Sequence, residues 1–202
     1  PTSTYYTPSL TFSLTGAGGS GTGNFSYSLN LVGTAQCSVS GSTLSYTKPG
    51  TCSVYVTRDG DSNYFAQTTA VTFTVTKADQ NVLGLNTSTV NFNATVANRT
   101  ILLSGTGGSG TGSFSYSLGA AGSAGCSVSA NVLTYTTAGT CSVLVTRGDD
   151  TNYNSRMDAI SIQVNKINQT TPTLASASGN NSGSSYSASL SGQGGESTGT
   201  FT

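Results

Sequence analysis

Residues 18–29 read GGSGTGNFSYSL, and residues 107–118 repeat them as GGSGTGSFSYSL. The two stretches begin 107 − 18 = 89 residues apart. The cysteines keep this offset, because Cys37 and Cys126 are 126 − 37 = 89 residues apart and the other two cysteines match in the same way. A period of this length is too long for a solenoid unit and suits a whole small β-sandwich of about 100 residues.

The Gly-rich start of this motif, GGSGTG, has two interpretations. Such loops cradle phosphates when a helix begins directly after them, because the helix N-terminus then faces the anion. Here the residues that follow, NFSYSL at 24–29, alternate apolar and polar side chains, which indicates a strand. We therefore predict that GGSGTG is a turn between two strands and that each domain contains one copy of it.

Further matches extend the repeat along the chain. GTCSVYVTR at 50–58 recurs as GTCSVLVTR, and the last residues, SASLSGQGGESTGTFT, resemble ILLSGTGGSGTGSFSY of the second copy. The pattern predicts three units: 1–78, a first repeat lacking its N-terminal part; 79–167, a second repeat; and 168–202, the N-terminal part of a third. We expect a segment of a longer array, although partial repeats that complete each other between subunits are the alternative.

Strands are predicted by alternation with a period of two. In residues 52–57, CSVYVT, the cysteine and both valines share one face, and residues 37–46 predict a hairpin that turns at Gly41-Ser42. About seven such strands per repeat predict an all-β fold of tandem immunoglobulin-like antiparallel β-sandwich domains. The other inward positions predicted are Phe12, Leu14, Phe25, Tyr27, Leu29, Val71, Phe73 and Val75, and then Ile101, Leu103, Phe114, Tyr116, Leu118, Val143, Val145, Ile160, Ile162 and Val164.

Composition limits the classes of function. Seven Lys and Arg balance seven Asp and Glu, so the basic excess typical of nucleic-acid partners is missing and we expect no nucleic-acid partner. The chain has no His, the commonest general base and metal ligand, and we expect no enzyme activity, no cofactor and no metal site. Its apolar runs are only a few residues long, so we expect no membrane span in this segment.

The four cysteines form two pairs with a spacing of 15 residues. This spacing differs from the C-x-x-C pattern of zinc and redox sites. We predict disulfides Cys37–Cys52 and Cys126–Cys141, each tying the hairpin to the next strand. In the chain-entropy model, closing a loop of this length stabilises a domain by roughly 3 kcal/mol. Disulfides indicate an oxidising, extracellular setting, whereas free buried cysteines in a cytosolic protein are the alternative.

Together these features resemble the Ig-like tandem repeats of large bacterial surface proteins and adhesins. The resemblance rests on the GGSGTG motif with its following strand, on CSVSGSTLSYTKPGTCSVYVTR at 37–58, on DSNY at 61–64 and on VTFTVTKADQ at 71–80, together with their second copies. It implies secreted, repetitive segments that form stalks or fibres. It carries over no catalytic residues.

Two loops offer candidate binding residues. Arg147, Gly148 and Asp149 spell RGD, which suggests engagement of an integrin-type receptor, but Gly-Asp is also ordinary turn chemistry and the first copy has the order RDG. The acidic loops DGDSNY and GDDTNY contain oxygens that suit Ca²⁺. We prefer the interpretation that their aspartates form Asx turns.

The sequence thus predicts a non-catalytic structural or adhesive protein of the extracellular space or cell surface. It would be a segment of a β-sandwich array that forms a stalk, fibre or surface filament. The partners expected are other copies of the chain or neighbouring repeats, in head-to-tail or lateral contact. The alternative is a ligand-binding module that recognises a glycan or a host protein through loops at the sandwich ends. A spacer attached to an enzyme is a third interpretation.

Overall fold

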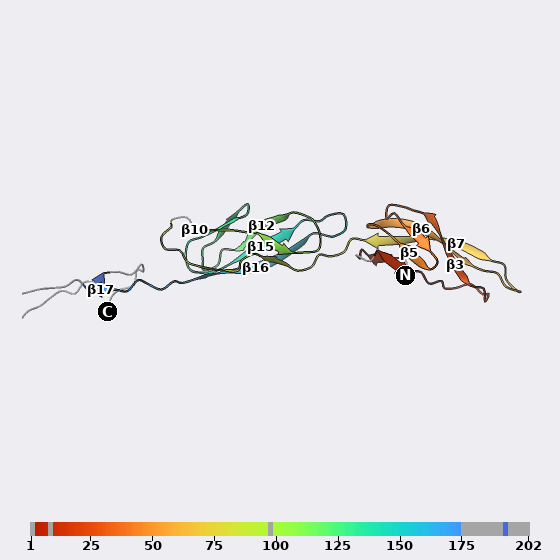
Figure 1. The fold of residues 1–202 in the computed structure, drawn as a ribbon, viewed down its shortest axis with the longest axis horizontal. Helices are drawn as coiled ribbons and strands as arrows, with labels where there is room; N and C mark the ends of the chain where they lie inside the picture. Colours follow the sequence, from red (N-terminus) through yellow and green to blue (C-terminus); the bar gives the residue numbers. More distant parts are fainter. Residues whose placement is uncertain (1–2, 8–9, 97–98, 175–191, 194–202) are drawn as a thin grey trace, which may run out of the picture.

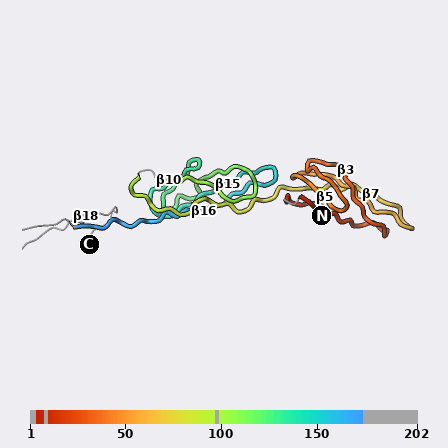
Figure 2. The backbone as a smooth tube through the Cα atoms, viewed as in Figure 1, coloured from red at the N-terminus to blue at the C-terminus, as the bar shows by residue number. Residues whose placement is uncertain are grey.

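A computed structural model describes residues 3–7, 10–96, 99–174 and 192–193. The chain forms two β-sandwiches that lie end to end, and no helix occurs in the described residues (Figure 1). The backbone leaves the first sandwich after β7 and enters the second directly (Figure 2). This confirms the predicted all-β fold of tandem immunoglobulin-like antiparallel β-sandwich domains.

The first sandwich packs a four-stranded sheet against a three-stranded one. The larger sheet has the order β1-β7-β6-β3, with β1 at Ser3–Tyr5, β7 at Gln67–Thr76, β6 at Gly50–Arg58 and β3 at Phe25–Leu31. The smaller has the order β2-β5-β4, with β2 at Thr11–Ser13, β5 at Thr43–Ser45 and β4 at Ser38–Ser40. The pairing is antiparallel except that β1 runs parallel to β7.

The second sandwich repeats this plan and adds one strand pair. Its larger sheet is β12-β15-β16-β9, with β12 at Phe114–Ala120, β15 at Gly139–Arg147, β16 at Arg156–Asn165 and β9 at Thr89–Asn91. Its smaller sheet is β10-β14-β13, with β10 at Arg99–Leu102, β14 at Val132–Tyr135 and β13 at Ser127–Ser129. The added pair is β8 at Leu83–Leu85 with β11 at Gly105–Gly107. After the second sandwich, β17 at Thr173–Leu174 pairs with β18 at Gly192–Gln193.

The repeated motifs have the local structures that were predicted. The hairpin of β4 and β5 turns at Gly41-Ser42, where Gly41 has a φ of 56°. GGSGTG is a turn, because its first two glycines are left-handed in both copies and a strand, not a helix, follows each copy. In the second copy, the first of these glycines, Gly107, is also the last residue of β11.

The predicted alternation accounts for four of the eight buried residues in the core of the first sandwich and for seven of the twelve in the core of the second. In the first sandwich the buried set includes Cys52, Val54, Phe73 and Val75, and in the second it includes Ile101, Leu103, Cys141, Val143, Val145, Ile162 and Val164. The prediction was wrong for Leu118. Its side chain is 37% exposed at the end of β12, where a bulge shifts the register between Leu118 and Ala120.

Each sandwich contains one disulfide. Cys37 is bonded to Cys52, and Cys126 is bonded to Cys141, with a Cα–Cα distance of 6.1 Å in both. Cys37 and Cys126 directly precede the hairpin strands β4 and β13, while their partners lie in the central strands β6 and β15. The bonds therefore join the two sheets of each sandwich at equivalent places.

The added strand β8 makes the two cores different. Leu83 of β8 is 3% exposed and belongs to the core of the second sandwich, and Leu85 packs against that core. In the described part of the first sandwich no strand occupies the equivalent place. There, the counterpart positions Phe12, Leu14 and Val56 are only half-buried and line a groove with a volume of about 230 Å³. The first sandwich is therefore open where the second is closed.

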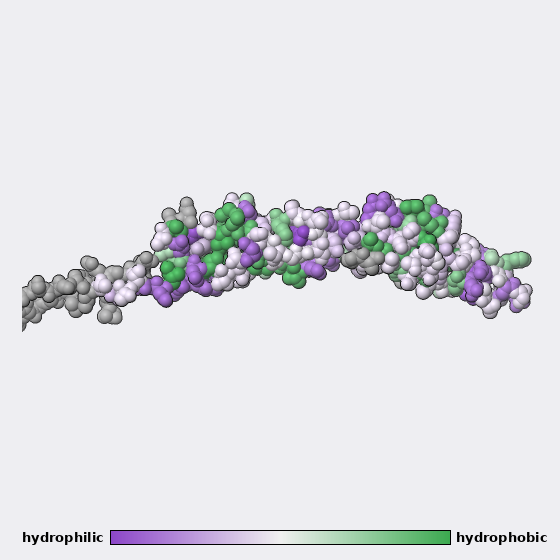
Figure 3. All heavy atoms as spheres, in the orientation of Figure 1, coloured by the Kyte–Doolittle hydropathy of each residue, from purple (hydrophilic) through white to green (hydrophobic). Residues whose placement is uncertain are grey.

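The surface of the visible face consists mainly of weakly polar residues, as the pale colour in Figure 3 shows. Apolar side chains interrupt it in patches on both sandwiches (Figure 3). The large apolar side chains that are exposed include Leu31, Tyr64, Phe65, Leu102, Met157 and Ile167. Of these, Phe65 is the most exposed, at 100%.

Candidate functional site: the junction between the sandwiches

The linker between the sandwiches, Lys77–Gln80, follows β7 without a break and lies against a loop of the second sandwich, residues 148–154. Its Ala78 forms an isolated parallel bridge with Tyr153. The Ala78 N–H donates to the Asn152 carbonyl at 3.0 Å, and the Asn154 N–H donates to the Ala78 carbonyl at 2.8 Å. The linker therefore binds the second sandwich as a short strand rather than spanning the gap as a free tether.

Gln80 anchors the end of this linker. Its residue is only 2% exposed, and its Nε2 donates to the carbonyls of Gly148 and Asn154, both at 2.9 Å. A polar side chain at this depth costs free energy unless it is hydrogen-bonded. The two acceptors of Nε2 make its position specific, while its buried Oε1 has no partner among the described residues. Gly108 of the GGSGTG turn leaves room for it, because a Cβ there would lie 2.7 Å from Gln80 Oε1.

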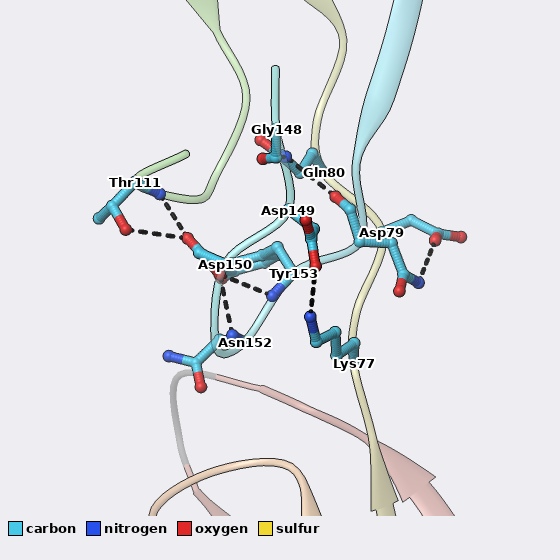
Figure 4. Close-up of polar contacts among 10 residues, drawn as sticks. Lys77, Asp79, Gln80, Thr111, Gly148, Asp149, Asp150, Asn152 and Tyr153 are labelled. Carbon is cyan, nitrogen blue, oxygen red and sulfur yellow. Dashed lines mark hydrogen bonds and ion pairs between the residues drawn. The ribbon is translucent and has the colours of Figure 1, made fainter. Parts of the chain in front are cut away.

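Charged and amide side chains flank the bridge (Figure 4). Lys77 Nζ contacts Asp149 Oδ2 at 2.8 Å, and this hydrogen bond, together with the lysine charge, lowers the pKa of Asp149. On the other side, Asn154 Nδ2 donates to Asp79 Oδ1 at 3.0 Å. The Lys77–Asp149 pair is partly exposed, so it contributes little stability by itself and mainly fixes which faces of the linker and loop meet.

A second pair, Arg156 and Asp158, fastens the residues that follow the linker. The Arg156 guanidinium donates to Asp158 and also to the Gln80 carbonyl at 3.2 Å. Asp158 Oδ2 accepts the Leu83 N–H at 2.8 Å, which sets the start of β8. The hydrogen bond from Arg156 is the main reason why the pKa of Asp158 is lowered, and the Leu83 N–H adds to it.

Asp150 gives the loop 148–154 its shape (Figure 4). Its Oδ1 accepts the N–H groups of Asn152 and Tyr153 at 2.8 and 2.9 Å, which is the Asx turn that was predicted. Its Oδ2 accepts the N–H and hydroxyl of Thr111 in GGSGTG. These bonds, the Thr111 N–H first, lower the pKa of Asp150 to about 2. The turn motif thus supports the loop that receives the linker.

The first sandwich forms the same loop from Asp61. Its Oδ1 accepts the N–H groups of Asn63 and Tyr64 at 2.9 and 3.0 Å, and its Oδ2 accepts the N–H of Thr22 at 2.6 Å. The pKa of Asp61 is lowered for the same reasons, led by the Thr22 N–H. Both sandwiches therefore present an Asx-turn loop at the same end, and within the described residues the linker 77–80 lies against the loop of the second sandwich.

An aromatic contact completes the junction. The ring of Tyr6, which follows β1 in the first sandwich, meets the ring of Tyr153 edge-on, with 5.7 Å between centroids. The geometry is a favourable one for aromatic pairs and brings the apolar part of the loop onto the first sandwich. The junction thus combines backbone pairing, a buried amide, an ion pair and an aromatic contact.

All three residues of the RGD tripeptide take part in contacts within the chain. Arg147 donates to the Gly107 carbonyl at 2.6 Å and lies over the Phe114 ring, at 4.9 Å from its centroid. The Gly148 carbonyl accepts Gln80, and Asp149 pairs with Lys77. The structure therefore places Arg147, Gly148 and Asp149 at the junction, and receptor binding by them stays a prediction.

Several junction residues were not recognised from the sequence. Gln80, Ala78 and Asn154 are of ordinary linker and loop types, and nothing in their chemistry marks them individually. The available signal was the repeat itself, because the linker KADQ recurs as KINQ and the loop DTNY corresponds to DSNY. Recurrence at one offset shows that both motifs belong to each repeat, but it does not place them in contact.

No protein-family model and no curated protein matches the chain. Solved structures with a similar fold include Drosophila N-cadherin EC1-4, with 14% identity, a TM-score of 0.39 and coverage of 73% of this chain and 42% of that one. Human CDH23 EC21-23 has 17% identity and a TM-score of 0.32, with coverage of 68% of this chain and 50% of that one. The protocadherin γB4 extracellular domain has 13% identity and a TM-score of 0.33, with coverage of 74% of this chain and 29% of that one. The chain spans half or less of each of these structures.

Two structural features are absent from the described residues. No helix there is long and apolar enough to cross a membrane. Likewise, no group of three or more His, Cys, Asp or Glu side chains in that part of the chain could hold a metal ion.

Proposed function

We propose that the chain is a non-catalytic structural module of the extracellular space, a segment of a β-sandwich array that serves as a stalk, fibre or surface filament. The units are those that the repeat predicts, 1–78, 79–167 and 168–202. Its origin among the repeats of bacterial surface proteins and adhesins is part of the same proposal. Neighbouring repeats and other copies of the chain are the partners.

The junction is the observation that carries this proposal. A flexible tether between two domains has a linker that is solvated and free to rotate. Here the linker is paired with the next sandwich on both sides of Ala78 and anchored by the buried Gln80. Such a connection supports transmission of force and maintenance of distance, which are what a stalk or fibre requires.

The disulfides support the extracellular part of the proposal. A bond in each sandwich at equivalent positions compensates for small cores, and such bonds persist in oxidising compartments. The face visible in Figure 3 carries mainly weakly polar side chains, which suits a molecule that extends through solvent without attracting charged partners.

Immunoelectron microscopy on intact cells of the source organism tests this function. Antibodies raised against the chain should label thin extensions outside the cell without permeabilisation. Label that is found only inside permeabilised cells would contradict the proposal. Reduction of the purified chain with a dithiol, followed by unfolding measurements, would show independently whether its disulfides contribute to stability.

A second candidate, a ligand-binding module, is favoured by one observation. The loop at the free end of the first sandwich exposes two aromatic side chains, Tyr64 at 51% and Phe65 at 100%. Aromatic rings on end loops suit recognition of a glycan or a host protein. A glycan array probed with the full chain and with Phe65→Ala tests this candidate, and binding that Phe65→Ala abolishes would support it.

A further inference from the structure

The segment between β9 and β10 contains a short motif that the proposed function does not use. Residues 93–95 read Asn-Ala-Thr, the pattern Asn-x-Ser/Thr in which the asparagine amide accepts an N-linked sugar. Within the described residues of the two sandwiches, three asparagines begin such a tripeptide, and the other two are Asn24 and Asn86. A chain rich in Asn, Ser and Thr forms this pattern by chance, so the local structure has to distinguish the three.

Asn93 is folded back on its own threonine. Its Oδ1 accepts the Thr95 N–H at 3.0 Å and the Thr95 hydroxyl at 2.8 Å. A backbone N–H can only donate, so the atom that faces it is the amide oxygen. The orientation of the carboxamide is thereby fixed, and its Nδ2 has no hydrogen-bond partner among the described residues. Because both residues are exposed, the nitrogen that an N-linked sugar joins is available in one orientation, which lowers the entropic cost of a reaction.

The backbone of Asn93 is held at the same time. Its carbonyl accepts Arg99 Nε at 2.6 Å, and the Arg99 guanidinium lies over the Phe92 ring, 4.3 Å from the centroid. Phe92 in turn donates its N–H to the Asn165 carbonyl at the end of β16, at 2.8 Å. None of these contacts uses an atom of the Asn93 side chain. The residue is therefore fastened to the sandwich while its amide nitrogen stays available.

The same segment is the place where the second repeat is longer than the first. Tyr6 and Phe92 are equivalent, because each donates its N–H to the last residue of the long strand beside it, and they are 92 − 6 = 86 residues apart. Phe12 and Ile101, which are equivalent by strand register, are 101 − 12 = 89 residues apart. The second copy thus has 89 − 86 = 3 additional residues here. The tripeptide lies in this longer connection outside the sheets, where added length and partners are tolerated best.

The two other tripeptides are held in a different way. Asn24 directly precedes β3, and its Ser26 lies inside that strand, opposite Thr57 of β6. Asn86 is bonded twice to Ser104, whose N–H donates to Asn86 Oδ1 at 3.1 Å and whose carbonyl accepts the Asn86 N–H at 2.9 Å. An enzyme that takes up either tripeptide has to open strand pairing or these bonds first.

From this geometry, we propose that Asn93 is the acceptor of an N-linked sugar, which a glycosyltransferase attaches to the folded chain. The donor is a sugar activated at its anomeric carbon as a diphosphate ester. Asn93 Nδ2 forms a bond to the anomeric carbon, and the bond from that carbon to the donor oxygen breaks. The diphosphate leaves with the electron pair, and the amide loses one proton to a base of the transferase. This inference goes beyond the proposed function and requires only that the chain meets such an enzyme.

Acceptor assays on the folded chain test the selectivity. The probe is a soluble N-glycosyltransferase that recognises Asn-x-Ser/Thr, with a nucleotide-activated hexose as the donor. Three peptides, each containing one tripeptide, measure the reactivity of that tripeptide without the fold. Relative to its own peptide, Asn93 in the folded chain should be modified at least about tenfold more than Asn24 or Asn86, because these two need local opening first. Peptide mapping by mass spectrometry locates the added hexose.

Variants around Asn93 test the role of the hydroxyl. Thr95→Val keeps the branched shape of the side chain but removes the hydroxyl, and it should abolish modification of Asn93. Thr95→Ser retains a hydroxyl and should retain modification. Asn91→Gln is the matched control, because Asn91 is an exposed asparagine two residues away that begins no tripeptide. This variant should be modified like the unaltered chain.

Chain isolated from the surface of the source organism provides the second test, and mass spectrometry of its peptides should find a sugar on Asn93. The proposal is overturned if Asn93 of this native chain is unmodified, or if the folded chain is not modified at Asn93 while its peptide is. It is also overturned if all three asparagines react equally relative to their peptides, or if Thr95→Val is still modified. An unmodified Asn93 on a chain that still labels surface fibres would refute this inference while leaving the proposed function intact.

Discussion

The two sandwiches share their strand plan and their disulfides but differ in how completely their cores are closed. In the second sandwich, Ile101 and Leu103 of the region around β10 are 8% and 2% exposed. Their counterparts in the first sandwich, Phe12 and Leu14, are half-buried and line an open groove. One short strand, β8, accounts for the difference, because Leu83 and Leu85 cover the place that is open in the first sandwich.

This difference shows that the linker and the core of the next sandwich are one connected structure. The segment that begins at Lys77 pairs with loop 148–154, anchors Gln80 and then becomes β8. A sandwich that receives such a segment gains both a closed core and a fixed neighbour. Each of the following predictions compares equivalent positions of the two sandwiches, starting with the largest expected effect.

Truncation of equivalent core leucines should have unequal effects. Leu103→Ala should destabilise the second sandwich by about 3–4 kcal/mol, because it leaves a cavity in a closed core. Leu14→Ala should cost the first sandwich about 1 kcal/mol, because its side chain is already partly in contact with water. Urea unfolding followed by NMR signals of each sandwich measures both. Equal losses at the two positions would mean that the open groove has no energetic consequence.

Removal of the disulfides should, in contrast, affect the two sandwiches alike. Both bonds join residues separated by 15 positions. Replacing Cys126 and Cys141 by Ala should therefore cost about 3 kcal/mol in the chain-entropy model, and the same change at Cys37 and Cys52 should cost a similar amount. Thermal unfolding of the two double variants gives the comparison. A loss confined to one sandwich would show that loop closure is not the main contribution there.

Substitution of the two linker glutamines should have unequal effects on stability, because Gln80 is buried in the junction and Gln169 is exposed. Gln80→Ala removes the donor to the carbonyls of Gly148 and Asn154 and should destabilise the second sandwich by about 2 kcal/mol. Gln169→Ala, at the equivalent but exposed position, should change the stability of the monomeric chain by less than about 0.5 kcal/mol. Unfolding at a concentration where the chain is monomeric measures both effects. If both variants lose the same stability, Gln80 is not an anchor.

Acid should weaken the loop that receives the linker. The pKa of Asp150 is about 2 in the folded chain, below its ordinary value of 3.8. Its stabilisation is therefore complete above about pH 5 and is lost as the pH falls toward 2, by about 1 kcal/mol after allowance for solvent screening. Unfolding measured at pH 5 and pH 2, with Asp150→Asn as the variant that lacks this dependence, provides the test. An NMR titration that places the Asp150 carboxyl at its ordinary pKa would contradict the expectation.

The sequence predicted the strands better than it predicted the connection between sandwiches. Alternation identified the inward faces because a half-buried strand imposes its period on every second residue, as Cys52 and Val54 illustrate. It failed at Leu118, which is exposed although the equivalent Leu29 is half-buried and a bulge follows both residues, so the pattern of residue types does not distinguish the two positions. The hairpin at Gly41-Ser42 was predictable because its turn chemistry is local.

The junction was harder to predict from the sequence than the strands were, and the reason is physical. Gln80 and Asp149 acquire their roles from partners roughly seventy residues away in sequence, and no local pattern records such a contact. Loop 148–154 was predicted as an Asx turn, which is local, but not as a docking surface. The closing of the second core by β8 was also missed, since a strand of three residues carries almost no periodic signal.

Residual dipolar couplings test most directly whether the junction holds the two sandwiches as one body. Couplings from backbone N–H groups of both sandwiches would be measured on the full chain in one weakly aligning medium, at a concentration where it is monomeric. The fixed linker predicts that a single alignment tensor fits both sandwiches and that Gln80→Ala splits it into two. Two clearly different tensors in the unaltered chain would contradict the rigid junction on which the proposed function rests.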